Sequence, residues 1–184
     1  MKKLFSDSLL GRLQKEVSLE ITIIGGAVPE ERNQKEEGLI LEAIEKHQIE
    51  HIVRMLGFQP YSVLMVQAYK HHIFISPSIT AKDGDTEGGA PVTIIEMAAT
   101  GMPIVSTTHC DIPEVIEDGV TGLLGPERDV DGLIYHIRWL LENPNSWEAM
   151  LSAGRKKVER EFDVRIQAER LRGFYRELCK SFYI

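Results

Sequence analysis

The chain has 184 residues, a formal net charge of −7 and 43% hydrophobic residues, which suits one soluble domain with its own core. The negative charge argues against nucleic acid or an anionic membrane as the main partner. The two cysteines, Cys110 and Cys179, form no CxxC pair, so neither a zinc site nor a disulfide framework is indicated and a reduced, cytoplasmic setting is expected. No apolar run approaches the length of a membrane span, while peripheral association through a surface helix stays open.

The periodicity of the apolar residues predicts helices that alternate with short strands. Strands are predicted, in chain order, at 19–24, 51–56, 73–75, 104–106 and 121–124. Helices are predicted at 1–17, 29–47, 61–69, 91–101, 130–141, 146–161 and 164–182, with a short helix starting at 111–113. This alternation indicates an α/β class with a Rossmann-like parallel sheet covered by helices on both faces. No linker interrupts residues 1–184, so a single domain is expected.

The most informative stretch runs from Glu87 to Ser106, with the sequence EGGAPVTIIEMAATGMPIVS. Gly88 and Gly89 allow a sharp turn and the close approach of a ligand, and Pro91 suits the first position of a helix. The free N–H groups at such a helix start can bind an anion. Glu96, one to two turns further on, can accept hydrogen bonds from two neighbouring hydroxyls, as a ribose presents them. The alternative is an ordinary glycine loop with a solvated glutamate.

Other polar candidates are weaker. His109-Cys110-Asp111 lacks a second group of metal ligands, so it is interpreted as a loop after a strand and no metal site is predicted. Lys82 is expected to be a solvated loop residue. Glu114 is either a surface acid or a residue beside a cleft.

The joint pattern of these segments resembles a known family. Glu87–Ser106 and the following Ile112–Leu124, IPEVIEDGVTGLL, resemble the C-terminal domain of the family-4 retaining glycosyltransferases, also called group 1. Earlier segments agree in order: ITIIG, then MLGF, then IFISPS. The resemblance covers nearly the whole chain, and within the family it is closest to enzymes of exopolysaccharide or colanic-acid type.

The resemblance implies the C-terminal half of a GT-B enzyme, in which two Rossmann-like domains face a cleft. This half would bind a nucleotide-diphosphate sugar as donor substrate, without a further cofactor. The activity implied is transfer of a glycosyl group, of hexosyltransferase type, with retention, in polysaccharide or glycoconjugate biosynthesis. A catalytic role is implied for Glu87, which contacts the donor sugar. The positions implied to bind the donor are Gly57, Phe58, Ser78, Gly88, Gly89, Ala90, Pro91, Val92, Thr93 and Glu96.

Two departures from the family pattern matter. Eight residues separate Glu87 from Glu96, one more than the family's usual spacing, which places the extra residue at Gly88 or Gly89. The family's domain also opens with a strand and a loop carrying an arginine and a lysine for the diphosphate, whereas this chain is expected to start in a helix after that point. The acceptor-binding N-terminal domain is expected to be a missing partner, and the isolated chain is expected to be inactive.

The expected absence of a first strand has a structural consequence. In a doubly wound sheet of order 3-2-1-4-5-6, strand 1 is central. The strand at 19–24 corresponds to strand 2 and the strand at 73–75 to strand 4, so two edges should face a gap. Exposed edges invite pairing between chains, and a homo-oligomer or a rearranged N-terminal region is predicted. Two other functions remain open: a non-enzymatic nucleotide-binding or interaction domain, and a sugar-nucleotide epimerase of similar fold.

Overall fold

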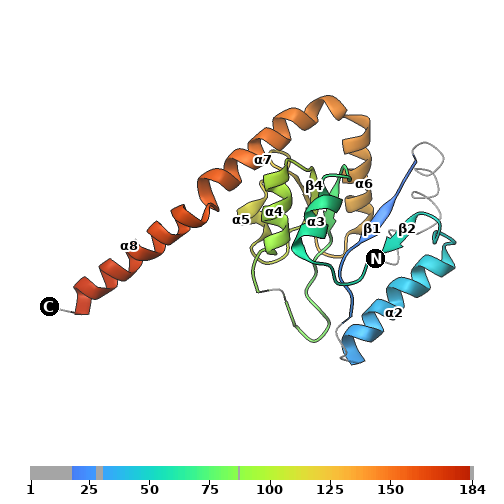
Figure 1. Cartoon of the computed structure of the whole chain (residues 1–184), viewed down its shortest axis with the longest axis horizontal. Coiled ribbons are helices and arrows are strands. Elements are labelled where there is room, and N and C mark those ends of the chain that lie inside the picture. Colours follow the sequence, from blue (N-terminus) through green and yellow to red (C-terminus); the bar gives the residue numbers. More distant parts are fainter. Residues whose placement is uncertain (1–17, 28–30, 87, 183–184) are drawn as a thin grey trace.

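The computed structural model describes residues 18–27, 31–86 and 88–182 (Figure 1). Within these ranges the strands are β1 (Ile21–Ile23), β2 (Val53–Met55), β3 (Phe74–Ser76), β4 (Ile104–Thr107) and β5 (Leu123–Gly125). The helices are α2 (Glu31–Lys46), α3 (Tyr61–Ala68), α4 (Val92–Thr100), α5 (Ile112–Val115), α6 (Val130–Glu142), α7 (Trp147–Glu161) and α8 (Val164–Phe182), with a 3₁₀ turn at Pro144–Ser146. Strands and helices alternate as predicted. The helix predicted at 1–17 lies outside the described residues.

The strands form two separate parallel sheets. β1 pairs with β2, with Ile21 opposite Val53, and the second sheet has the order β3-β4-β5. Among the described residues, β1 and β3 therefore each have a strand neighbour on one side only. This is the order expected of a doubly wound sheet, with strands 3 and 2 in one group and strands 4, 5 and 6 in the other.

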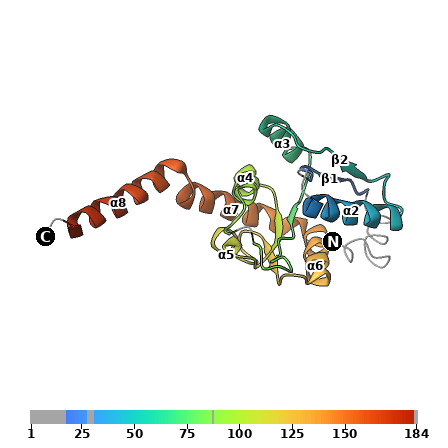
Figure 2. The ribbon, with the colours of Figure 1, turned by 90° about the horizontal axis from the view of Figure 1, so that it is seen from below.

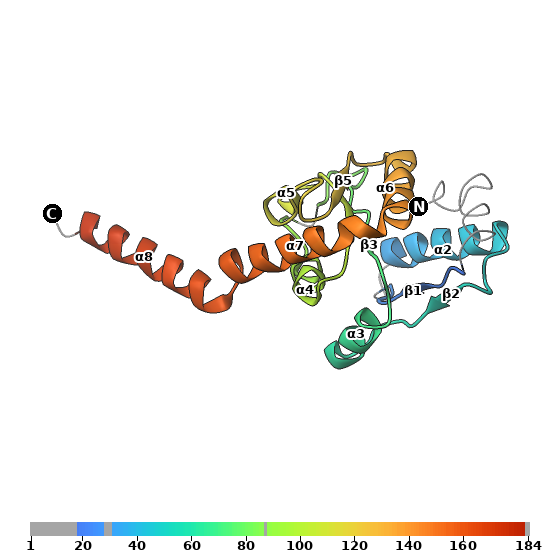
Figure 3. The same ribbon diagram turned by 90° about the horizontal axis from the view of Figure 1, so that it is seen from above.

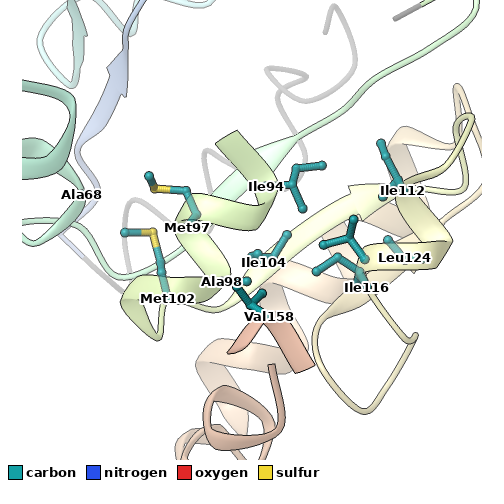
Figure 4. Packing of buried hydrophobic residues seen from close by; sticks show 11 residues of the cluster. Ala68, Ile94, Met97, Ala98, Met102, Ile104, Ile112, Ile116, Leu124 and Val158 are labelled. Carbon is teal, nitrogen blue, oxygen red and sulfur yellow. The ribbon is translucent and has the colours of Figure 1, made fainter. Parts of the chain in front are cut away.

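Strand β4 is the centre of the core. All its residues are buried, and their side chains alternate between the two faces of the sheet. Ile104 packs into a cluster with residues of α4, α5 and α7, which Figure 4 shows from close by. Val105 packs on the opposite face with residues of α6 and α2. Helices thus cover both faces, and the predicted fold class is confirmed.

The cluster that contains Val105 also joins the two sheets. Ala43 and Ile44 of α2 pack in one core with Val105 and with the buried residues of α6, while Ile21 of β1 and Ile73 before β3 lie at its margin. A hydrogen bond of 2.9 Å between His71 Nε2 and Thr22 Oγ1 spans the same region. The small sheet is therefore held to the large one by side chains.

Helix α8 projects from the body of the molecule in all three views (Figures 1, 2 and 3). It is strongly amphipathic, with its apolar face exposed: Leu171 and Leu178 are each 54% exposed and Phe174 64%. No helix in the described ranges is long and apolar enough to cross a bilayer.

Candidate functional site

The loop between β3 and α4 carries most of the predicted site. It leaves the carboxyl end of β3, the side of a parallel sheet on which such folds bind ligands. Gly88 is exposed and has φ +70°, a left-handed conformation that favours glycine. Gly89 has no such preference: a Cβ there would meet Asp111 Oδ2 at an ordinary 3.7 Å. Gly89 therefore packs beside the turn after β4, while Gly88 makes the bend.

The start of α4 is open. Pro91 occupies the N-cap position, one residue earlier than the first helical position predicted for it. Among the described residues no side chain caps this end, the first turn holds no acidic residue, and Val92 is 67% exposed. Unpaired N–H groups and the helix dipole make such an end attractive to an anion. At the other end Gly101 stops the helix in the left-handed conformation, φ +78°, as predicted.

Glu96 shares a face of α4 with Val92, one turn away. Ile94, Met97 and Ala98 are buried and fix the helix against the sheet, which leaves Glu96 half-buried. Within the described part of the chain, the Glu96 carboxylate takes part in no hydrogen bond or ion pair. With respect to the described residues, its oxygens can therefore accept hydrogen bonds from a ligand.

The other predicted positions lie on the small sheet. Gly57, with φ +63°, accepts a 2.8 Å hydrogen bond from the Gly25 N–H, so the glycine turns after β1 and β2 meet. Phe58 is 66% exposed, and a Cβ at Gly26 would lie 3.6 Å from its ring. The ring thus lies beside Gly26 and is exposed enough to stack on a ligand.

The structure therefore places the predicted residues in two groups. Ser78 and the positions from Gly88 to Glu96 follow β3 in one loop and helix, whereas Gly57 and Phe58 follow β2 in the other sheet. Glu87 lies outside the described residues. Lys82 is exposed, as expected.

Sequence reasoning did not find a polar cluster beside this loop. His109 follows β4 and is 1% exposed, and its Nδ1 lies 2.7 Å from Glu127 Oε1, which follows β5. The same carboxylate accepts from the Thr80 N–H at 2.7 Å and from the Thr80 hydroxyl at 3.2 Å. Their positions in the sequence could have indicated the cluster, because Thr80, His109 and Glu127 each follow the carboxyl end of one of three neighbouring strands, β3, β4 and β5. No group of three or more metal-ligating side chains lies in the described ranges.

These hydrogen bonds lower the pKa of the Glu127 carboxyl. The bond from His109 and then that from the Thr80 N–H hold the pKa of the Glu127 carboxyl below its ordinary value, because both favour the ionised form. The carboxyl side chain is 27% exposed while that of His109 is wholly buried.

Comparison with known proteins agrees with this architecture. The family model described as "Glycosyl transferases group 1" matches residues 8–157, and the chain belongs to this family. Amylovoran biosynthesis glycosyltransferase AmsK of Erwinia amylovora is 38% identical over 129 residues, 70% of this chain and 31% of AmsK. WcaL of Salmonella typhimurium, whose name refers to colanic acid biosynthesis, is 36% identical over 121 residues, 65% of this chain and 30% of WcaL. The chain thus spans less than a third of these relatives.

Solved structures share the fold. The C-terminal domain of the group 1 glycosyltransferase LpcC from Francisella tularensis has a TM-score of 0.72 at 15% identity, over 89% of this chain and 78% of that one. Anabaena HepE in complex with UDP has a TM-score of 0.73 at 21% identity, over 86% of this chain and 41% of HepE. The fold is therefore that of glycosyltransferase domains, as the resemblance predicted.

Proposed function

We propose that this chain is the nucleotide-sugar-binding domain of a retaining glycosyltransferase in polysaccharide or glycoconjugate biosynthesis. The observation that carries the proposal is the start of α4, where an open helix end follows the Gly88 turn and the half-buried Glu96 carboxylate lies within the same helix. The N-terminal end of a helix attracts a phosphate, and a carboxylate can accept hydrogen bonds from two vicinal hydroxyls. Together they match a nucleoside diphosphate.

Each residue has a role in this proposal. Phe58, beside Gly57, stacks on the base. Ser78 and the backbone from Gly88 to Thr93, including Ala90, Pro91 and Val92, contact the diphosphate and the sugar. Glu96 accepts from the ribose hydroxyls, and Glu87 contacts the donor sugar. The names of AmsK and WcaL support a polysaccharide role, and the UDP complex of HepE supports a uridine nucleotide.

The chemistry assigned to the domain is positioning and charge stabilisation. The bond between the anomeric carbon and the diphosphate oxygen breaks, and a bond to the oxygen of an acceptor hydroxyl forms on the same face of the sugar, while the proton of that hydroxyl passes to the departing diphosphate. The open end of α4 stabilises the charge that develops on the diphosphate. The acceptor would be held by the rest of the enzyme, so we propose that the 184-residue chain alone binds donor without turnover.

Ligand-observed NMR with UDP- and GDP-sugars tests this proposal. Saturable binding is expected for at least one of them, and Glu96→Ala should weaken it about tenfold or more, because hydrogen bonds to a charged group contribute about 1.5–3 kcal/mol. Glu148→Ala, an exposed glutamate on α7, is the matched control. If no nucleotide binds at millimolar concentration, the result favours the alternative of a non-enzymatic interaction domain.

The role of Glu87 has a separate test. Glu87→Gln should weaken binding of the sugar nucleotide while the affinity for UDP stays unchanged, since UDP lacks the donor sugar that Glu87 is proposed to contact. Equal losses for the two ligands would contradict the assigned contact.

A further inference from the structure

We infer that His109 and Glu127 are positioning residues that fix the segment from Pro77 to Thr80, and through it Ser78, for binding a diphosphate. The inference rests on the proposed function, but the contacts that carry it come from two loops without an assigned role. The anchored segment is the first part of the loop that leads from β3 to the Gly88 turn.

Thr80 is held at each of its polar groups. Its N–H donates to Glu127 Oε2 at 2.7 Å and its hydroxyl to Glu127 Oε1 at 3.2 Å. Its carbonyl oxygen accepts from the Arg128 guanidinium. Backbone N–H, backbone carbonyl and side chain of one loop residue are thus bound by two consecutive residues after β5, which fixes the loop in position and orientation.

His109 fixes the carboxylate in turn. An ionised carboxylate only accepts hydrogen bonds, so the 2.7 Å contact requires the proton on His109 Nδ1. The other ring nitrogen, Nε2, lies 3.3 Å from Cys110 Sγ. With both nitrogens engaged and the side chain wholly buried, the imidazole has one orientation, and so has Glu127.

The same segment is held from β4. Thr107 Oγ1 donates to the Ser78 carbonyl oxygen, and Ser106 Oγ to the Ser76 carbonyl oxygen, both at 2.6 Å. Both hydroxyl residues are buried, and a buried hydroxyl is costly unless it is hydrogen-bonded. Ser78 is therefore fixed by its own carbonyl from β4 and by the anchored Thr80 two residues on.

The backbone beside the cluster is unusual. Cys110 has φ +44° and Arg128 φ +64°, a region that residues with a Cβ rarely adopt. They follow His109 and Glu127 directly, and such conformations persist where the surroundings hold them and gather at functional sites. The turns after β4 and β5 thus both present their polar side chains to the loop after β3.

Calorimetric titration of the whole chain with UDP and with uridine tests the inference. Uridine can make only the base and ribose contacts, whereas UDP can also make the diphosphate contact. Glu127→Ala should weaken UDP binding about tenfold and leave uridine binding within about twofold. Glu127→Gln keeps one acceptor oxygen and should show a smaller loss. Glu159→Ala, which breaks an exposed ion pair with Arg155, is the control and should change neither affinity.

Amide exchange without ligand separates this inference from the proposed function. The Thr80 N–H should exchange faster in Glu127→Ala, while the Leu124 N–H, held by Asp118 Oδ1 at 2.8 Å, should not change. If the wild type binds neither ligand, the proposed function fails, but the exchange rate of the Thr80 N–H still tests whether Glu127 holds the loop at Thr80. Equal losses for UDP and uridine, or wild-type exchange at Thr80, would overturn the inference.

Discussion

At the scale of single residues, Glu127 makes stability depend on pH. Its pKa is lowered in the folded chain, first by His109 and then by Thr80, so near the ordinary value the unfolded chain binds more protons. Its contribution to stability is therefore present above the ordinary glutamate value of 4.5 and is lost as the pH falls through the lower folded value.

Glu127→Gln should remove this dependence. The free energy of unfolding of the wild type should exceed that of the variant at pH 7, and the difference should shrink as the pH falls below the ordinary glutamate value. Urea titrations between pH 7 and pH 3 measure it, with Glu159→Gln as the exposed control. A difference that stays constant over this range would show that the Glu127 charge does not contribute.

At the scale of elements, the length of α4 depends on Gly101. Gly101→Ala should destabilise the chain by about 1–2 kcal/mol, because the residue has φ +78°, a conformation that a Cβ disfavours. Gly38→Ala is the matched control: Gly38 is inside α2, where an added Cβ would have no heavy atom of the described residues within 4 Å, and the change should stabilise by about 0.5–1 kcal/mol. If thermal melts showed melting temperatures shifted in the same direction for Gly101→Ala and Gly38→Ala, the prediction would be contradicted.

Helix α8 should contribute little to the stability of the body. Its apolar face is exposed, and its hydrogen bonds to the rest of the chain are surface contacts such as that from Gln167 to the Glu161 carbonyl oxygen. A chain ending at Asp163 should melt within about 2 °C of the full chain. A fall of several degrees would mean that α8 packs on the body in solution.

The elements were largely predictable because each has a local signal. The strand predicted at 19–24 is found at Ile21–Ile23, and the helix predicted at 164–182 has those limits. The glycine turns and the stop at Gly101 follow from conformations that one residue type supplies. The link from His109 to Glu127 could not be found in this way, because it joins residues on different loops that meet only when β4 and β5 pair.

At the scale of the whole molecule, the sheet is divided. β1 and β3 each lack a second strand neighbour within the described ranges, and unpaired strand edges favour pairing with another chain. We predict self-association, visible as a sedimentation coefficient that rises with concentration, together with slower amide exchange over Leu19–Ile24. A monomer at all concentrations with that strand strongly protected would contradict the prediction.

The proposal that a nucleotide binds at the start of α4 is tested most directly by titrating the ¹⁵N-labelled chain with UDP. We expect saturable shifts of the amides of Ser78, Gly89 and Val92 to Thr93, and of Phe58 if the two groups of residues act in one site. At a UDP concentration near the wild-type Kd, these shifts should be strongly reduced in Glu96→Ala and kept in Glu148→Ala. No shift at millimolar UDP, or shifts confined to other parts of the chain, would contradict the assignment of this surface as a donor site.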